Sequence, residues 1–212
     1  HGTDYFFHAF SYPDFRYLSS FGRRGDAPQD MLSAENFRWN GQFLWTLDSN
    51  KSELTRFGFA SSSDSLLSLE VVSLDEELLR ALDFVQYDDS TFIIPDYSGD
   101  SRFCLVSRQG KLLRKVGNIP TTNEDALESA RPALAQAWRS FIDYNPHNGI
   151  LVAATQLGEV LEIYNLKDST HIACIGPNGE PEFQISQGYG IPTGIMGFSD
   201  VQVTDTAIYV VF

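Results

Sequence analysis

A repeated strand pattern is the feature that most constrains what this chain can fold into. Four segments each contain a short alternating strand, a polar turn and a more continuously apolar strand. They align at Trp39, Tyr87, Tyr144 and Val203, which are 48, 57 and 59 residues apart. The segments are FRWNGQFLWTLD (37–48), FVQYDDSTFIIPD (84–96), FIDYNPHNGILVAAT (141–155) and DVQVTDTAIYVVF (200–212). Self-similarity at a nearly constant spacing indicates a repeat architecture.

A second pair of apolar strands follows the first in three of these units. The pairs are 52–59 with 66–72, 101–107 with 111–117, and 159–166 with 170–176. Each unit is therefore four short antiparallel strands joined by tight turns. Such units, repeating about every 40 to 50 residues, are typical of propeller blades. A β-sandwich is the alternative, but it need not repeat itself in this way. We predict an all-β fold, a β-propeller of four-stranded antiparallel blades.

One short helical insert interrupts the strands at about residues 123–138. This stretch is rich in Ala, Leu and Glu, with its acidic residues early, as the N-terminus of a helix prefers. Pro132 is expected to split or restart the helix, because proline cannot continue one from its interior. The insert precedes the unit that begins at residue 141 and accounts for the 57-residue step.

The number of blades follows from the repeat. We expect the N-terminus to supply the last three strands of a first blade, followed by three complete blades and two strands of a fifth. About four and a half blades would then be present, and a six-bladed ring would need roughly 60 to 70 further residues. The chain also ends on an apolar strand, 208–212, without a closing turn. We expect residues 1–212 to form a single propeller domain that is incomplete at its C-terminus.

The tripeptide Arg24-Gly25-Asp26 matches the adhesive signal that integrins read, but its context indicates a turn. It lies within GRRGDAP (22–28), and a similar stretch, GPNGEPEF (176–183), follows another predicted outer strand. Glycine permits the positive φ that a crossover between blades needs, and proline stiffens the exit. We interpret the tripeptide as part of a blade-exit loop, because short motif matches arise often by chance.

The segment YLSSFGRRGDAPQDM (17–31) resembles the strand and GxxGxxP stretch of six-bladed TolB-like and NHL-like propellers. The similarity is greatest to a poorly characterised TolB-like group abundant in Bacteroidetes. The unit that begins at residue 37 departs from the pattern, since no glycine exit follows Val72. The resemblance implies an exported, often lipid-anchored protein of the periplasm or outer-membrane surface, and it supplies no catalytic residues.

The formal net charge of −13 constrains the partners. Such a surface repels phosphate backbones and anionic membranes, so we expect no nucleic-acid partner. We expect contact with a membrane only through a lipid anchor outside this chain, because no apolar run approaches the length of a membrane span. The two cysteines, Cys104 and Cys174, are too few for the disulfide framework of a small secreted domain. We expect buried free thiols, with a single bridge as the alternative if their strands meet.

The sequence contains none of several common catalytic motifs. The histidines, His1, His8, His147 and His171, do not have the spacing of metal ligands, and there is no GxSxG, P-loop or GxGxxG motif. We therefore expect no catalytic residue, no metal and no cofactor.

The first strand of each unit provides the candidate binding residues. In a propeller these strands line the central channel, and alternate side chains face opposite ways. The packed side would hold Phe37, Trp39, Val85, Tyr87, Ile142, Tyr144, Val201 and Val203. The channel side would hold Arg38, Gln86, Asp143 and Gln202. These four form either a polar ring that binds a ligand or a hydrated channel wall.

The function that fits these observations is a non-enzymatic binding or scaffolding propeller of an exported bacterial protein. Its partner would be an unknown protein or small-molecule ligand. The alternative is a propeller enzyme, such as a metal-dependent lactonase or a lyase, with its site in the central channel. An adhesive protein that uses the Arg-Gly-Asp tripeptide is a third hypothesis.

Overall fold

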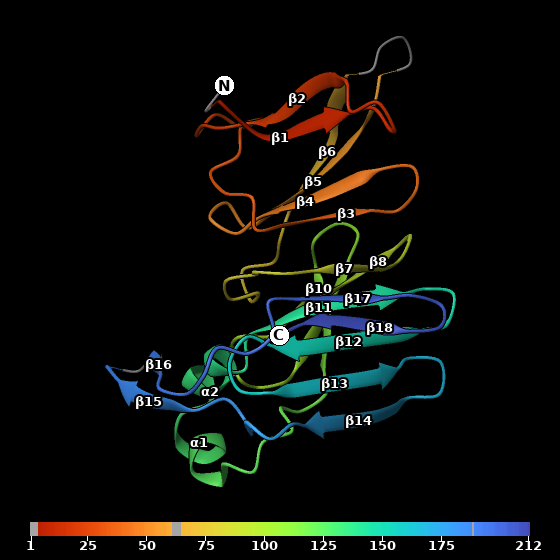
Figure 1. Ribbon diagram of the computed structural model, residues 1–212. Coiled ribbons are helices and arrows are strands. Elements are labelled where there is room, and N and C mark those ends of the chain that lie inside the picture. Colours follow the sequence, from red (N-terminus) through yellow and green to blue (C-terminus); the bar gives the residue numbers. More distant parts are fainter. Residues whose placement is uncertain (1–3, 61–64, 188) are drawn as a thin grey trace.

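The structure is a computed structural model that describes residues 4–60, 65–187 and 189–212. Three four-stranded antiparallel sheets follow one another in chain order, and we refer to them as the first, second and third full blades (Figure 1). The first contains β3 (Asn36–Trp39), β4 (Leu44–Asp48), β5 (Glu53–Phe59) and β6 (Leu66–Ser73). The second contains β7 (Val85–Asp88), β8 (Thr91–Pro95), β9 (Phe103–Ser107) and β10 (Leu112–Val116). The third contains β11 (Ser140–Asn145), β12 (Ile150–Thr155), β13 (Val160–Asn165) and β14 (Thr170–Ile175). The predicted blades are confirmed.

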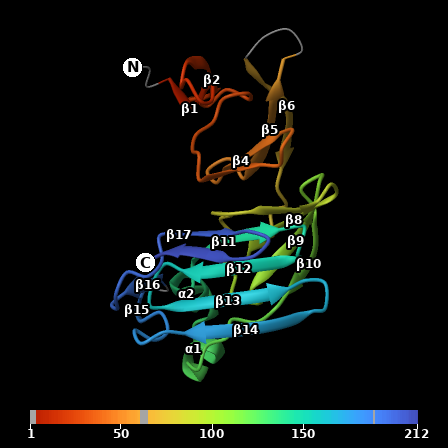
Figure 2. The ribbon, with the colours of Figure 1, turned by 45° about the vertical axis from the view of Figure 1, so that its right-hand side comes forward.

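Partial sheets flank the full blades at both ends of the chain (Figure 2). At the C-terminus, β17 (Asp200–Val203) and β18 (Ile208–Val211) pair as predicted, and β17 returns to lie beside β11. At the N-terminus, β1 (Tyr5–Phe10) and β2 (Tyr17–Arg23) form a sheet of two strands, where three were expected. The chain after β2 closes into a loop instead of extending. The hairpin of β15 (Phe183–Ser186) and β16 (Tyr189–Pro192) was not predicted, and it packs on the helical insert.

Apolar side chains between neighbouring blades form the core. The strands β4 and β8 are buried along their whole length, because each lies inside its sheet and is covered on both faces. Trp45 and Phe92 meet edge to face across the first and second full blades, with their ring centroids 5.0 Å apart. A second cluster, which includes Ile93, Phe103 and Leu151, joins the second and third full blades.

The helical insert forms as predicted, as α1 (Glu124–Ser129) and α2 (Arg131–Ala137). Asn123 caps α1 by accepting a hydrogen bond from the backbone N–H of Ala126. Pro132 lies in the first turn of α2, where backbone N–H groups have no partner within the helix. Proline lacks this N–H and so loses no hydrogen bond there, and the helix restarts at this point. None of the helices in the described part of the chain is long and apolar enough to cross a membrane.

A fully buried ion pair lies beneath the helical insert and joins two blades. The Arg102 guanidinium donates to both carboxylate oxygens of Glu162, at 2.6 to 3.1 Å. It also donates to the backbone carbonyl of Trp138 and to the Ser140 hydroxyl. Tyr164 donates to the second oxygen of Glu162. Every polar atom of the ion pair is thus satisfied, as a buried pair requires.

The Arg24-Gly25-Asp26 tripeptide lies in a closed loop after β2. The Gly25 N–H donates to the Met31 carbonyl at 3.1 Å, and the Lys51 ammonium donates to the carbonyl of Ala27 at 2.7 Å. The Arg24 guanidinium lies 3.9 Å from the centroid of the Phe6 ring, within cation–π distance. The structure thus gives the loop an architectural role, in agreement with its interpretation as a turn.

Both cysteines are free thiols. Cys104 is buried in β9, and burial raises the pKa of its thiol to about 12. Cys174 is exposed, which contradicts the expectation that both are buried. The reason is its place on β14, the outermost strand of the third full blade, where all six residues are exposed.

Candidate functional site

Three of the four candidate residues line one pocket of about 440 Å³. Arg38, Gln86 and Asp143 reach it from β3, β7 and β11, the first strands of the three full blades. Gln202 is exposed on β17 and does not line this pocket. The strand alternation therefore brings Arg38, Gln86 and Asp143 together, and their role toward a ligand stays a prediction.

Arg38 uses most of its hydrogen-bond donors within the protein. Its Nε donates to the Phe84 carbonyl at 2.9 Å. Its Nη2 donates to Asp83 Oδ1 at 3.0 Å and to the Ile142 carbonyl at 2.5 Å. Only Nη1 faces Asp143, at 4.0 Å from Oδ1. Arg38 thus connects β3 with the residues just before β7 and with β11, and little of its guanidinium remains for a ligand.

Asp83 is the partner that sequence reasoning missed. Its carboxylate, with only 5% of the side chain exposed, accepts hydrogen bonds from Asn36, Arg38 and the backbone N–H groups of Phe84 and Ile142. Burial raises the pKa of Asp83, and the Arg38 charge opposes that shift. The sequence did carry a signal. Asp83 lies two residues before Val85, so strand alternation places its side chain on the same packed side as Val85 and Tyr87. A carboxylate buried on that side needs a cation as its partner.

Asp143 bonds to the neighbouring blade in a similar way. Its Oδ2 accepts a hydrogen bond from the backbone N–H of Val203 at 2.7 Å, and burial raises the pKa of its carboxyl group. Asp83 contacts Ile142 of the next blade by the same kind of bond. Two carboxylates thus each hold the first strand of the blade that follows.

Aromatic side chains form much of the remaining wall of this pocket. Trp39 is 51% exposed, and the rings of Tyr87 and Tyr144 lie 5.5 Å apart. The expectation that Phe37 and Trp39 face a packed core is wrong, because Phe37 is 55% exposed. Within the described residues, the N-terminal sheet next to β3 has only two strands, and the Phe37 ring lies at 78° to the Phe7 ring with centroids 5.9 Å apart.

The charge of the pocket is negative. Asp88 and Asp89 lie at its wall together with Asp143, while the charge of Arg38 is balanced by Asp83. Gln86 accepts a hydrogen bond from Asn40 at 3.0 Å and keeps its position at the wall. Carboxylates and amides accept hydrogen bonds from hydroxyl groups, and aromatic faces cover apolar C–H surfaces. The pocket disfavours an anionic ligand for electrostatic reasons.

The described residues do not form a metal centre. No group of three or more His, Cys, Asp or Glu side chains that could hold a metal ion occurs in residues 4–60, 65–187 and 189–212. His1 lies outside these ranges. His147 is exposed in the turn between β11 and β12, and its ring lies 3.2 Å from Asp205.

The fold and the pocket together define a class of protein. Four-stranded antiparallel sheets repeat along the chain, and their first strands meet at one polar pocket, which is the arrangement of a β-propeller. A family model described as TolB-like 6-blade propeller-like matches residues 1–212. The chain therefore belongs to the TolB-like six-bladed propeller family, which confirms the resemblance in residues 17–31.

Comparison with solved structures gives matches of low identity. Sqt1 of Saccharomyces cerevisiae is 7% identical with a TM-score of 0.51, over 96% of this chain and 61% of that one. A functionally unknown protein of Desulfotomaculum acetoxidans is 11% identical with a TM-score of 0.47, over 79% of this chain and 47% of that one. A Bacteroides fragilis protein provisionally named as exported is 11% identical with a TM-score of 0.48, over 76% and 42%. The chain thus spans between 42% and 61% of the length of these structures. No curated protein matches the chain.

Proposed function

We propose that this chain is the ligand-binding propeller of an exported bacterial protein, and that its inner pocket takes a small neutral molecule rich in hydroxyl groups. The observation that carries the proposal is the pocket at β3, β7 and β11, where aromatic faces stand beside amide and carboxylate acceptors. Its volume of about 440 Å³ lies within the range of small-molecule sites, roughly 300 to 1,000 Å³.

The ligand class follows from charge and hydrogen bonding. An anion would meet Asp88, Asp89 and Asp143 without a free cation to offset them, since Arg38 is engaged by Asp83. A hydroxyl group can donate to these carboxylates without carrying a charge of its own into the pocket. A neutral ring can also cover Trp39, whose half-exposed indole offers an apolar face.

Titration calorimetry with glucose, maltose and myo-inositol as neutral probes, and gluconate and glucose 6-phosphate as anionic probes, tests the pocket. We expect a neutral probe to bind more tightly than its anionic counterpart. Trp39→Ala and Gln86→Ala should each weaken this binding about tenfold or more. Tyr209→Ala and Gln184→Ala remove exposed side chains of the same types elsewhere and serve as matched controls.

Three results would contradict the proposal. The first is tighter binding of the anionic probes. The second is that the Trp39 and Gln86 variants bind the probes with the same affinity as the wild type. The third is chemical conversion of a bound probe. Conversion together with tightly held divalent metal in the purified protein would favour the enzyme hypothesis.

Export is a second part of the proposal and has its own test. It rests on the resemblance to exported TolB-like propellers in residues 17–31. Fractionation of cells that express the natural gene product should place it in the periplasm or at the outer-membrane surface. Recovery in the cytoplasm alone would refute this part and leave the binding test unaffected.

A further inference from the structure

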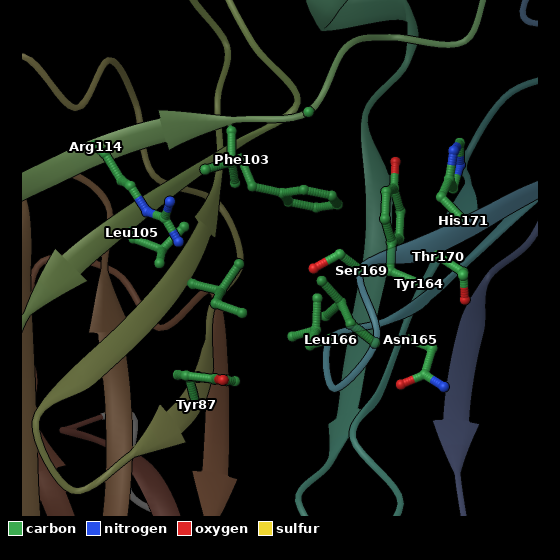
Figure 3. A pocket seen from close by; sticks show the side chains of 14 residues that line it. Tyr87, Phe103, Leu105, Arg114, Tyr164, Asn165, Leu166, Ser169, Thr170 and His171 are labelled. Carbon is green, nitrogen blue, oxygen red and sulfur yellow. The ribbon is translucent and has the colours of Figure 1, made fainter.

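A second cavity, which shares only Tyr87 with the lining of the inner pocket, opens between the second and third full blades. It has a volume of about 330 Å³ and lies between β9 and β10 on one side and β13 and β14 on the other. Figure 3 shows Leu105 and Arg114 on one wall and Tyr164, Leu166 and Ser169 on the opposite wall. Both blades are complete four-stranded sheets, so this cleft does not result from a missing strand.

The floor and inner walls of this inter-blade cleft are apolar. Ile93, Phe103 and Leu151 belong to the buried core between the two blades and form its base. The Tyr164 ring lies edge to face with Phe103, at 5.2 Å between centroids. On its other side, the imidazole of His171 stacks on Tyr164 at 4.2 Å, with an angle of 13° between the planes. This aromatic wall can hold a flat apolar group.

The rim of the cleft carries hydrogen-bond donors, and the acidic side chain beside it, Asp168, accepts hydrogen bonds from Asn165 and Thr170. No Asp or Glu occurs among the residues that line the cleft, although the chain carries a net charge of −13. Within the described residues, the side chains of Arg114 and Ser169 form no hydrogen bond or ion pair. Glu162 lies behind Tyr164, where Arg102 neutralises it.

We infer that the inter-blade cleft binds a small molecule with an apolar, ring-shaped body and one carboxylate. The body would lie against Tyr164 and the floor formed by Ile93 and Leu151. The carboxylate would be at the rim, where the Arg114 guanidinium can donate two parallel hydrogen bonds. This ligand is anionic, whereas the one expected for the inner pocket is neutral, so the two sites are separable by experiment.

The probe is 3-phenylpropanoate, and 3-phenylpropan-1-ol is its neutral counterpart of nearly the same shape. Binding is measured by titration calorimetry and by shifts of backbone amide signals in NMR spectra of the whole chain. We expect the carboxylate to bind about tenfold or more tightly than the alcohol at low salt, with the difference shrinking as salt screens Arg114. The amide shifts should concentrate in β9, β10, β13 and β14.

Two variants and two controls complete the test. Arg114→Gln should remove the preference for the carboxylate and leave the alcohol unaffected. Arg23→Gln makes the same change of charge at an exposed position on β2 and should leave the preference intact. Leu105→Trp should block both probes by filling the cleft. Gln86→Ala, which alters the inner pocket, should change neither affinity.

Several outcomes would overturn the inference. Equal affinity for the carboxylate and the alcohol would remove the anionic part of the assignment. If the Arg114→Gln variant still binds the carboxylate more tightly than the alcohol, the ligand lies elsewhere. Amide shifts outside the four strands would lead to the same conclusion. Absence of binding to the folded wild-type chain at millimolar probe would refute the site itself. If Leu105→Trp does not fold, the amide shifts and the Arg114 variant still decide.

Discussion

Replacement of Arg38 by alanine tests the finding that this residue holds blades together. In the structure Arg38 donates to Asp83, Phe84 and Ile142, so its loss removes bonds to the second and third full blades at once. It also leaves the Asp83 carboxylate, which is 5% exposed, without a cation. Removal of one partner of a buried ion pair costs about 3 to 5 kcal/mol.

Two features reduce this cost. The Arg38 side chain is 25% exposed, so part of its charge is already solvated. Asp83 keeps hydrogen bonds from Asn36 and from the N–H groups of Phe84 and Ile142, and it can also take up a proton, because burial already raises its pKa. We therefore expect Arg38→Ala to lower the free energy of unfolding by about 2 to 4 kcal/mol.

Urea unfolding, followed by the fluorescence of the buried Trp45 and Trp138, measures the loss. Arg23→Ala is the matched control, because Arg23 is exposed and surface substitutions usually change stability by less than about 0.5 kcal/mol. A double-mutant cycle of Arg38→Met with Asp83→Asn should give a coupling energy of about 1 to 3 kcal/mol. If Arg38→Ala is as stable as the Arg23→Ala control, or if the coupling energy is near zero, Arg38 only lines a hydrated wall.

Three further predictions concern stability. Glu162→Gln should lower the free energy of unfolding by about 3 to 5 kcal/mol in a urea titration, because it leaves Arg102 buried with its charge unbalanced. Replacement of both Glu162 and Arg102 by apolar residues should recover most of the loss. Gly25→Ala should lower the free energy of unfolding by about 1 kcal/mol or more, because φ at Gly25 is +157° and an added Cβ would meet the Asp30 carboxylate. A change in the free energy of unfolding below the error of calorimetry would contradict this prediction. Asp143 has a raised pKa when folded, so the stability it contributes is present at low pH and is lost as pH rises from 3.8 through the folded value. The free energy of unfolding of the wild type minus that of Asp143→Asn should therefore fall across this range in urea titrations at each pH, and a gap that rises or stays constant would refute the assignment.

The fold was predictable because its signals are local. Each first strand is short and alternating, each second strand is apolar throughout, and polar turns separate them, so pairing order follows from the chain itself. The helix start at Asn123 and the restart at Pro132 were equally local. The hairpin of β15 and β16 was missed for the opposite reason. Its strands have four residues each and are mostly exposed, and its Gly190 lies against the backbone of Ala133, a contact that no local pattern reveals.

The inner pocket could be located from the sequence, but the roles of its residues could not. Alternation within β3, β7 and β11 correctly brings Arg38, Gln86 and Asp143 to one pocket, because it fixes which way each side chain leaves its own strand. It does not say which backbone groups of the next blade lie within reach. Arg38 and Asp143 meet carbonyl and N–H groups of residues more than forty positions away, and those contacts make Arg38 in particular a structural residue.

We therefore expect the aromatic side chains to take the larger part in any ligand contact at the inner pocket. A charged side chain that is already saturated by protein partners can bind a ligand only by giving up those bonds, and each costs about 0.5 to 1.5 kcal/mol or more to lose. Trp39 gives up nothing of this kind, because half of its surface already faces water. The residue expected to be packed is thus better placed for binding than the arginine beside it. The same reasoning favours Arg114 at the inter-blade cleft, where the structure gives the guanidinium no partner among the described residues. The charged group to test at a new site is the one that the fold has not already used.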